Sequence, residues 1–336
     1  MLYLLLFLFG ESLAMDSLKI GNAMNIFGRY GFMGVSMKVV GRPQPWVFRE
    51  PSVDVFEIME DDIISYTDKD GAIFNGDFHM EFCDDVTQLL EAYFREFRIE
   101  HAKEPWKAFA ASWSDEAIAK NFGLNTSYIA HDYCYVLVRL SRNKESKKLS
   151  DDAASNLKPL EHIKHSSDDV EYGNAASVGN FVKKFGSHYI MSYTTGDSLY
   201  QVIVYHPPVY HRLKKKLRKT GITSLRKVEL QAFFSPWYAD HVGQILSSSG
   251  NSTIAEWAKS ALRSRSFMFP YSSLLKLYGN EKLLRELDKK LENGALLSLE
   301  LKTLTPLFND QTKKQWFVEV ISNVIELWES NMRLSY

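Results

Sequence analysis

The pattern of apolar and polar positions predicts a chain in which strands alternate with helical segments. Strands are indicated by alternation with a period of two, or by dense β-branched and aromatic residues between turn-forming residues. A tight turn is predicted at Asp70-Gly71, just before the second such segment. The predicted strands are residues 53–58, 72–83, 126–143, 187–205 and 271–279.

Helices are predicted where apolar residues recur three and four positions apart. The helical face given at the end of this paragraph is followed by a second helical piece, expected at 106–122. The polar stretch 144–159 is expected to be a loop or an exposed linker. Beyond 279, apolar spacing from Leu283 to Leu291 and from Phe317 to Trp328 predicts a helical tail. The first helical face comprises Val86, Leu89, Leu90, Tyr93, Phe94 and Phe97.

The stretch 181–206 (FVKKFGSHYIMSYTTGDSLYQVIVYH) combines two glycines, a histidine and many β-branched or aromatic residues. Its start predicts a helix that ends at Gly186, a residue suited to a left-handed C-cap. The strand that follows is too long to stay flat, and Gly196 in its middle predicts a bend or bulge. His188 is expected to be a hydrogen-bonded core residue where helix meets strand.

This order of elements indicates an α+β protein with long helical insertions between the strands of one sheet. The sequence contains no nucleophile elbow, zinc-protease motif or phosphate loop, so we expect no enzyme and no cofactor. The pairs His162/His165 and His206/His211 are expected to be ordinary surface histidines, with no metal site.

The segment FGSHYIMSYTTGD resembles the signature of the membrane-attack-complex/perforin (MACPF) superfamily: aromatic, Gly, Ser or Thr, His, aromatic, six residues, two glycines. Phe185 is a looser match than the usual Tyr or Trp, and Asp197 replaces the second glycine. Within the superfamily, the wording SHYIMSYTTGDSLYQV, the small size and the scarcity of cysteine most resemble the arthropod Torso-like proteins. The matching residues are Phe185, Gly186, Ser187, His188, Tyr189 and Gly196.

The resemblance implies a bent four-stranded antiparallel sheet with two helical clusters inserted between its strands. In pore-forming members such clusters unfurl into membrane hairpins. We expect the MACPF-like domain at 71–279, an N-terminal segment at 15–70 packed on it, and a helical C-terminal extension at 280–336. Similarity to Torso-like proteins implies an extracellular cue in embryonic terminal patterning, upstream of the receptor tyrosine kinase Torso. The alternative is a pore-forming or membrane-perturbing effector.

The N-terminus predicts secretion. An apolar run from Leu2 to Phe9 precedes Ser12-Leu13-Ala14, which places small residues where a signal peptidase cleaves, so residues 1–14 are interpreted as a signal peptide. A buried N-terminal strand is the alternative, since the run is too short to span a bilayer. Asn125 and Asn251 begin N-glycosylation triplets, as expected for an extracellular glycoprotein.

Cys83 and Cys134 are the only cysteines. In a secreted protein they would most simply form a disulfide, which would close a loop of about fifty residues and tether the helical segment between them. Two buried free thiols are the alternative, because the sequence does not give the register of the two strands.

Charge is balanced over the chain, with 40 basic and 41 acidic side chains, which argues against a wholesale nucleic-acid binder. Cations nevertheless gather after the two prolines that follow His206. They form either a solvated helix face or a surface that binds anionic lipid or sulfated matrix. The eight residues, with no acid among them, are Arg212, Lys214, Lys215, Lys216, Arg218, Lys219, Arg226 and Lys227.

Charge also bears on pore formation, because a lipid-facing strand needs about ten residues with every second one apolar. The basic segment carries cations at both odd and even positions, and charged residues between Glu91 and Glu100 also occupy both. The pattern favours a non-lytic protein. The resemblance to Torso-like proteins implies extracellular protein partners in a receptor tyrosine kinase pathway.

Overall fold

The computed structural model describes residues 18–27, 53–67, 78–110, 113–130, 132–220, 225–264, 270–291 and 295–331. The predicted signal peptide at 1–14 and the predicted turn at Asp70-Gly71 lie outside these residues.

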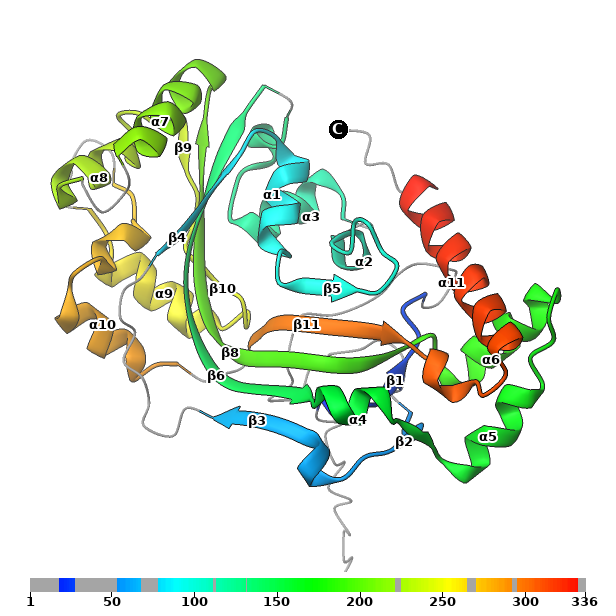
Figure 1. Ribbon diagram of the computed structural model, residues 1–336. Coiled ribbons are helices and arrows are strands. Elements are labelled where there is room, and N and C mark those ends of the chain that lie inside the picture. Colours follow the sequence, from blue (N-terminus) through cyan, green and yellow to red (C-terminus); the bar gives the residue numbers. More distant parts are fainter. Residues whose placement is uncertain are drawn as a thin grey trace, which may run out of the picture.

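One bent, mainly antiparallel sheet runs through the molecule (Figure 1). Its longest strands, β6 (Cys134–Leu149) and β8 (His188–Tyr205), pair along most of their length. On one side β3 and β4 pair with successive parts of β6, and on the other β11 pairs with β8. These four strand positions confirm the predicted bent sheet. The outer strands are β3 (Ile63–Thr67), β4 (His79–Cys83), β11 (Ala295–Thr303) and, parallel to β11, β5 (Phe97–Ile99).

Short strands extend this sheet. β1 (Ala23–Met24) pairs with the start of β8, so this part of the N-terminal segment lies against the sheet. β9 (His241–Val242) and β10 (Leu246–Ser247) pair with the second half of β8. β2 (Phe56–Glu57), within the strand predicted at 53–58, forms a separate two-stranded sheet with β7 (Lys158–Pro159).

Two helical clusters flank the β6–β8 pair, on opposite sides in Figure 1. The first, between β4 and β6, comprises α1 (Val86–Tyr93), α2 (Lys107–Ala110), α3 (Asp115–Phe122) and the 3-10 helix Thr126–Tyr128. The second, between β8 and β11, comprises α7 (Pro207–Thr220), α8 (Lys227–Phe233), α9 (Ser252–Ala261), the 3-10 helix Leu274–Leu277 and α10 (Glu281–Asp288).

The remaining helices gather at the other end of the bent sheet (Figure 1). Phe317 of the C-terminal helix contacts Phe181 of α6, with ring centroids 5.8 Å apart. These helices are α4 (Asp151–Ser155), α5 (Glu161–Asp168), α6 (Ala175–Phe185) and α11 (Gln311–Asn331), with 3-10 helices at Glu60–Asp62 and Thr305–Leu307.

Helix starts follow local side-chain chemistry. The residue before the first turn carries a short oxygen-bearing side chain, which accepts a hydrogen bond from a backbone N–H that the helix itself leaves unpaired. Residues that cap helices in this way are Asp85, Ser114, Ser150, Asn174, Asn251 and Asn280.

The sheet separates two hydrophobic cores, one beneath each cluster. Successive strand residues point to opposite faces, so Tyr135 and Leu137 of β6 enter the first core whereas Val136 and Val138 enter the second. This explains why β6 and β8 read as continuous apolar runs, because both faces of the sheet are covered.

The sheet bends at Gly196. This residue pairs with Asn143, and a Cβ atom added to it would lie 2.0 Å from the carbonyl oxygen of Arg142. The registers of both neighbouring strands shift next to it, between Asn143 and Glu145 and between Leu296 and Ser298. The predicted bend is therefore confirmed, and close backbone approach is the reason that it needs glycine.

The third strand lies further along the chain than predicted. A strand was expected at 126–143, but Thr126–Tyr128 is a 3-10 helix and β6 begins only at Cys134. β6 then continues through residues 144–149, which were expected to be a loop. Although these residues are mostly charged or polar, pairing with β3 on one side and β8 on the other satisfies their backbone groups.

The prediction for the last strand was wrong. Residues 271–279 contain the 3-10 helix Leu274–Leu277, and the fourth strand of the sheet is β11. β11 lies inside the expected helical extension, so a boundary at 279 would leave one of the four strands out of the domain. Phe97, expected on a helix, likewise begins β5.

The cysteines lie next to one another in the sheet but on opposite faces. Cys83 pairs in register with Tyr135, the residue after Cys134. Cys83 belongs to the first core and Cys134 to the second, and both are free. The structure therefore favours two buried thiols over the disulfide. Burial raises the pKa of Cys83 to about 12 and that of Cys134 to about 11.

Gly196→Val is expected to lower the free energy of unfolding by ~3 kcal/mol or more, because its side chain would collide with the Arg142 carbonyl. Urea denaturation measures the change. Gly179→Ala in α6 is the matched control: nothing lies within 4 Å of its added Cβ, so a change of under ~1 kcal/mol is expected. A Gly196→Val protein that is secreted and as stable as wild type would show that the bend does not need glycine.

Neither thiol is expected to react with iodoacetamide in the folded protein at pH 7.5, because both are buried and their raised pKa values keep them protonated. After denaturation without a reductant, both should be alkylated. Mass spectrometry of unreduced digests reads out each site, and a peptide pair linked through Cys83 and Cys134 would contradict the placement on two faces.

Candidate functional site

The signature residues form a tight corner between α6 and β8. Gly186 ends α6 with a φ of 94° and a ψ of −179°, so its φ is positive, as a glycine C-cap predicts, but its ψ is extended. An added Cβ would lie 2.7 Å from the carbonyl of Met24. Ser187 ties the same segment down, since its N–H donates to Met24 O at 2.9 Å and its Oγ accepts from Ile26 N at 3.3 Å.

His188 is fully buried in this corner. Its Nδ1 lies 2.9 Å from Ser187 Oγ and its Nε2 lies 3.3 Å from the carbonyl oxygen of Glu100. Burial lowers the pKa of His188 to about 4, so the neutral ring is the form present at physiological pH. His188 thus fastens the start of β8 to Glu100, in the segment that follows α1. Among the described residues it forms no hydrogen bond with Asp197.

Asp197, in the place of the second signature glycine, takes part in a buried ion-pair cluster at the bend. Its side chain is 1% exposed and lies 3.3 Å from the Arg142 guanidinium, which also pairs with Asp288. Asp288 is the last residue of α10, so this clamp (Arg142, Asp197 and Asp288) joins the bend to the second cluster. Removing one partner of such a cluster typically costs ~3–5 kcal/mol because a buried charge is left unpaired.

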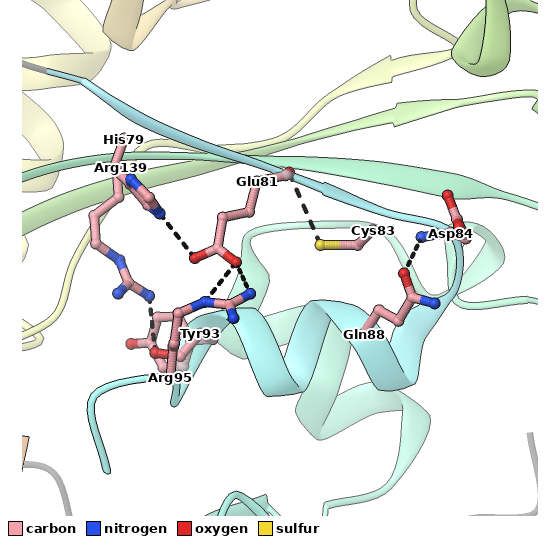
Figure 2. Close-up of polar contacts among 8 residues, drawn as sticks. All are labelled: His79, Glu81, Cys83, Asp84, Gln88, Tyr93, Arg95 and Arg139. Atoms are coloured by element: carbon pink, nitrogen blue, oxygen red, sulfur yellow. Dashed lines mark hydrogen bonds and ion pairs between the residues drawn. The ribbon is translucent and has the colours of Figure 1, made fainter. Parts of the chain in front are cut away.

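The first cluster is joined to the sheet by a polar seam between α1, β4 and β6 (Figure 2). Glu81 of β4 accepts a hydrogen bond from Arg95 Nε at 2.8 Å and lies 3.0 Å from His79 Nε2. Arg139 of β6 donates from Nη2 to the carbonyl of Tyr93, the last residue of α1, at 2.8 Å. Its guanidinium also lies over the Tyr93 ring, 5.1 Å from the centroid.

The two clusters also contact each other. Asp84, just before α1, accepts a hydrogen bond from Lys214 of α7 at 2.5 Å. This hydrogen bond is the largest cause of the lowered pKa of the Asp84 carboxyl. The pair spans the edge of the sheet, so α7 and the start of α1 hold each other in place.

The predicted basic surface lies mainly on α7. Lys214 is engaged with Asp84, and Lys216 lies with its Nζ 4.4 Å from the Phe233 ring centroid. Arg226 and Lys227 belong to the start of α8, where Arg226 pairs with Glu229. The other cations of α7 have exposed side chains, and we call them the α7 basic surface. They are Arg212, Lys215, Arg218 and Lys219.

The other predicted site residues lie apart. Asn125 is exposed and Asn251 is partly exposed, each at the cap of a helix. His162 and His165 are exposed on α5, and His206 pairs with Asp240 at 3.2 Å. Within the described ranges, no three His, Cys, Asp or Glu side chains gather as a metal site. No helix in that part of the chain is both long and apolar enough to cross a membrane.

Sequence reasoning missed the residues that hold the clusters to the sheet. Arg139 and Arg142 lie within the apolar run of β6, and a charged residue in a strand buried on both faces was the available signal. Their partners could not be identified, because Asp288 is distant in sequence and the Tyr93 contact uses a backbone oxygen.

Comparison with known proteins yields similarity only at the level of structure: no protein-family model and no curated protein matches the chain. GNIP1Aa from Chromobacterium piscinae aligns with a TM-score of 0.50 and 11% identity, over 94% of this chain and 56% of that one. The chain therefore spans little more than half the length of GNIP1Aa.

Two further structures align more weakly. A cell invasion protein with a MAC/Perforin domain from Bacteroides thetaiotaomicron has a TM-score of 0.41 and 9% identity, over 92% of this chain and 60% of that one. Astrotactin-2, described as perforin-like and involved in neuronal development, has a TM-score of 0.37 and 14% identity, over 92% of this chain and 99% of that one. The bent sheet, the two inserted clusters, the glycine corner and the alignment with GNIP1Aa together show that this chain has a MACPF-like fold.

Proposed function

We propose that the chain is a secreted, non-enzymatic protein of MACPF-like fold that acts as an extracellular cue in developmental signalling. The resemblance of residues 187–202 to Torso-like proteins supports a place upstream of the receptor tyrosine kinase Torso, with extracellular protein partners. The observation that carries the non-lytic part of the proposal is the clamp, which fixes the second cluster to the bend through buried charges.

Pore formation would require both clusters to leave the sheet and become lipid-facing strands. For the second cluster this would separate Asp288 from Arg142, so the largely buried guanidinium would lose one of its two ion-pair partners and keep Asp197. The α7 segment would then place cations at both odd and even positions. Each charged side chain at the bilayer midplane costs ~2–4 kcal/mol on a barrel exterior, so several together oppose insertion.

The second candidate function is a membrane-perturbing effector, and one segment favours it. Even-numbered positions from Val228 to Phe234 are apolar, whereas Glu229 and Gln231 lie among the odd ones, and Pro236 ends the pattern. Such alternation suits a membrane strand. Val228 and Trp237 are also 77% and 74% exposed in the folded protein. Against this function, the segment covers only part of the second cluster, and the cationic α7 precedes it.

The α7 basic surface supports attachment to an anionic surface outside the cell. Lys215, Arg218 and Lys219, with Lys214 and His211, line one open depression on α7 beside Asp84. Cations near an anionic leaflet contribute ~1 kcal/mol each, so the exposed residues together would retain the protein at anionic lipid or sulfated matrix.

The purified protein is expected to release no more dye from liposomes than buffer does, with detergent defining full release. Liposomes of neutral lipid and of lipid with added phosphatidylserine should behave alike in this respect, because neither supplies the free energy to open the clamp. The signalling half of the proposal is measured separately, by Torso phosphorylation in receptor-expressing cells treated with the protein. Robust dye release would establish the effector function instead.

The triple variant Lys215→Gln, Arg218→Gln, Lys219→Gln is expected to elute from heparin at clearly lower salt than wild type, because it removes three exposed cations from one surface. Lys282→Gln, Lys289→Gln, Lys290→Gln on and after α10 is the matched control with the same change in net charge. Equal elution of the two triple variants would show that α7 has no special role.

A further inference from the structure

A polar cavity of about 260 Å³ lies at the bend, on the face of the sheet covered by the first cluster. β6, β8 and β11 supply its floor, while Tyr93 and Phe97, from the end of α1 and from β5, and Ser248, just after β10, supply its walls. The lining residues are Tyr93, Glu96, Phe97, Arg139, Ser141, Asn143, Thr194, Ser198, Ser248, Leu296, Leu297 and Ser298.

Several hydrogen-bonding groups of this cavity are open to solvent and have no partner within the described protein. Ser141 and Ser198 bond to each other at 3.0 Å, and Thr194 pairs with Ser146. By contrast, the side chains of Asn143, Ser248 and Ser298 form no hydrogen bond with any residue that the structure describes. A concave site at which a few polar groups converge is a usual form of small-molecule site.

Arg139 brings a positive charge to the same cavity, where the Glu81 and Glu96 carboxylates act on it from beyond ion-pair distance. Its Nη2 bonds to the Tyr93 carbonyl, but its Nε is buried without a hydrogen-bond partner. Among the described residues, no carboxylate forms an ion pair with it. The placement of Arg139 against Tyr93 is visible in Figure 2. Burial lowers the pKa of Arg139, which shows that the surroundings disfavour its charge and that a bound anion would offset this cost.

We propose that this cavity binds a small ligand that carries an oxyanion, namely a carboxylate, sulfate or phosphate group. Arg139 holds the oxyanion, and Asn143, Ser248 and Ser298 donate further hydrogen bonds to it. The volume corresponds to about nine water molecules at ~30 Å³ each, so the remainder of the ligand is small. Glu96 is exposed at the cavity, where its carboxylate would accept a hydrogen bond from a hydroxyl group of the ligand and repel a second negative charge.

The position of the cavity gives such a ligand a structural effect. A ligand held there contacts β6, β8 and β11 at the bend and touches the end of α1 at the same time. It would stabilise attachment of the first cluster to the sheet, as the clamp does for the second. This site does not depend on the signalling role proposed above.

The test is binding of simple oxyanions to the full-length protein by calorimetry and by thermal unfolding. Sodium sulfate, sodium phosphate and sodium glucuronate are compared with sodium chloride at equal ionic strength, and glucose serves as the uncharged counterpart of glucuronate. We expect saturable binding and a higher unfolding temperature with at least one oxyanion, and none with chloride or glucose. Tighter binding of glucuronate than of sulfate would identify an acidic sugar, and the reverse an inorganic or esterified anion.

Arg139→Gln is expected to weaken binding at least about tenfold, because it removes a charge-assisted hydrogen bond. If that variant does not fold, Ser248→Ala combined with Ser298→Ala keeps the arginine and should still weaken binding about threefold or more. The Lys215, Arg218, Lys219 triple variant is the control for anions bound on α7 and should bind as wild type does. The proposal is overturned if no oxyanion binds saturably, or if binding is unchanged by the cavity substitutions and lost in the α7 variant.

Discussion

The contact between Gly196 and the carbonyl of Arg142 is the constraint on which the rest of the structure depends. No side chain fits between the two strands there, and the registers of β6 and β11 shift on either side. Because both long strands turn at this point, the sheet presents two differently shaped faces, each covered by its own helical cluster. The same turn brings Arg142, Asp197 and Asp288 together on one face. It places Arg139 and the polar cavity on the other.

The clusters are fastened to the sheet mainly by polar contacts at its bend and edge, in addition to their apolar cores. Buried ion pairs contribute little net stability compared with apolar packing, but breaking one is costly. Such contacts therefore oppose detachment of a cluster more than they strengthen the folded state. The non-lytic function proposed above agrees with this, because these contacts would have to break before the second cluster could leave the sheet. This is why the replacement of a signature glycine by Asp197 matters: it adds an acidic side chain where the pattern has none.

The sequence predicted the parts of the fold that depend on local pattern. The corner at Gly186, the bend at Gly196 and the helical face at Val86–Phe94 all follow from spacing and residue type. Prediction from the sequence failed where pairing between distant segments overrides local preference. β11 has leucines at spacings that also fit a helix, and residues 144–149 are too polar to be recognised as a strand without their neighbours. The clamp and the cavity could not be predicted, since their residues meet only when distant segments pack together.

The placement of the two cysteines has a consequence for measuring motion in this protein. Each thiol faces a different core, so each is shielded by a different cluster. If opening is fast compared with chemical labelling, the labelling rate of a buried thiol is proportional to the population of the open state that exposes it. Cys83 would thus report on detachment of the first cluster, and Cys134 on that of the second. The chain carries two native probes, and comparing their rates would give the opening free energy of each cluster without any engineered label.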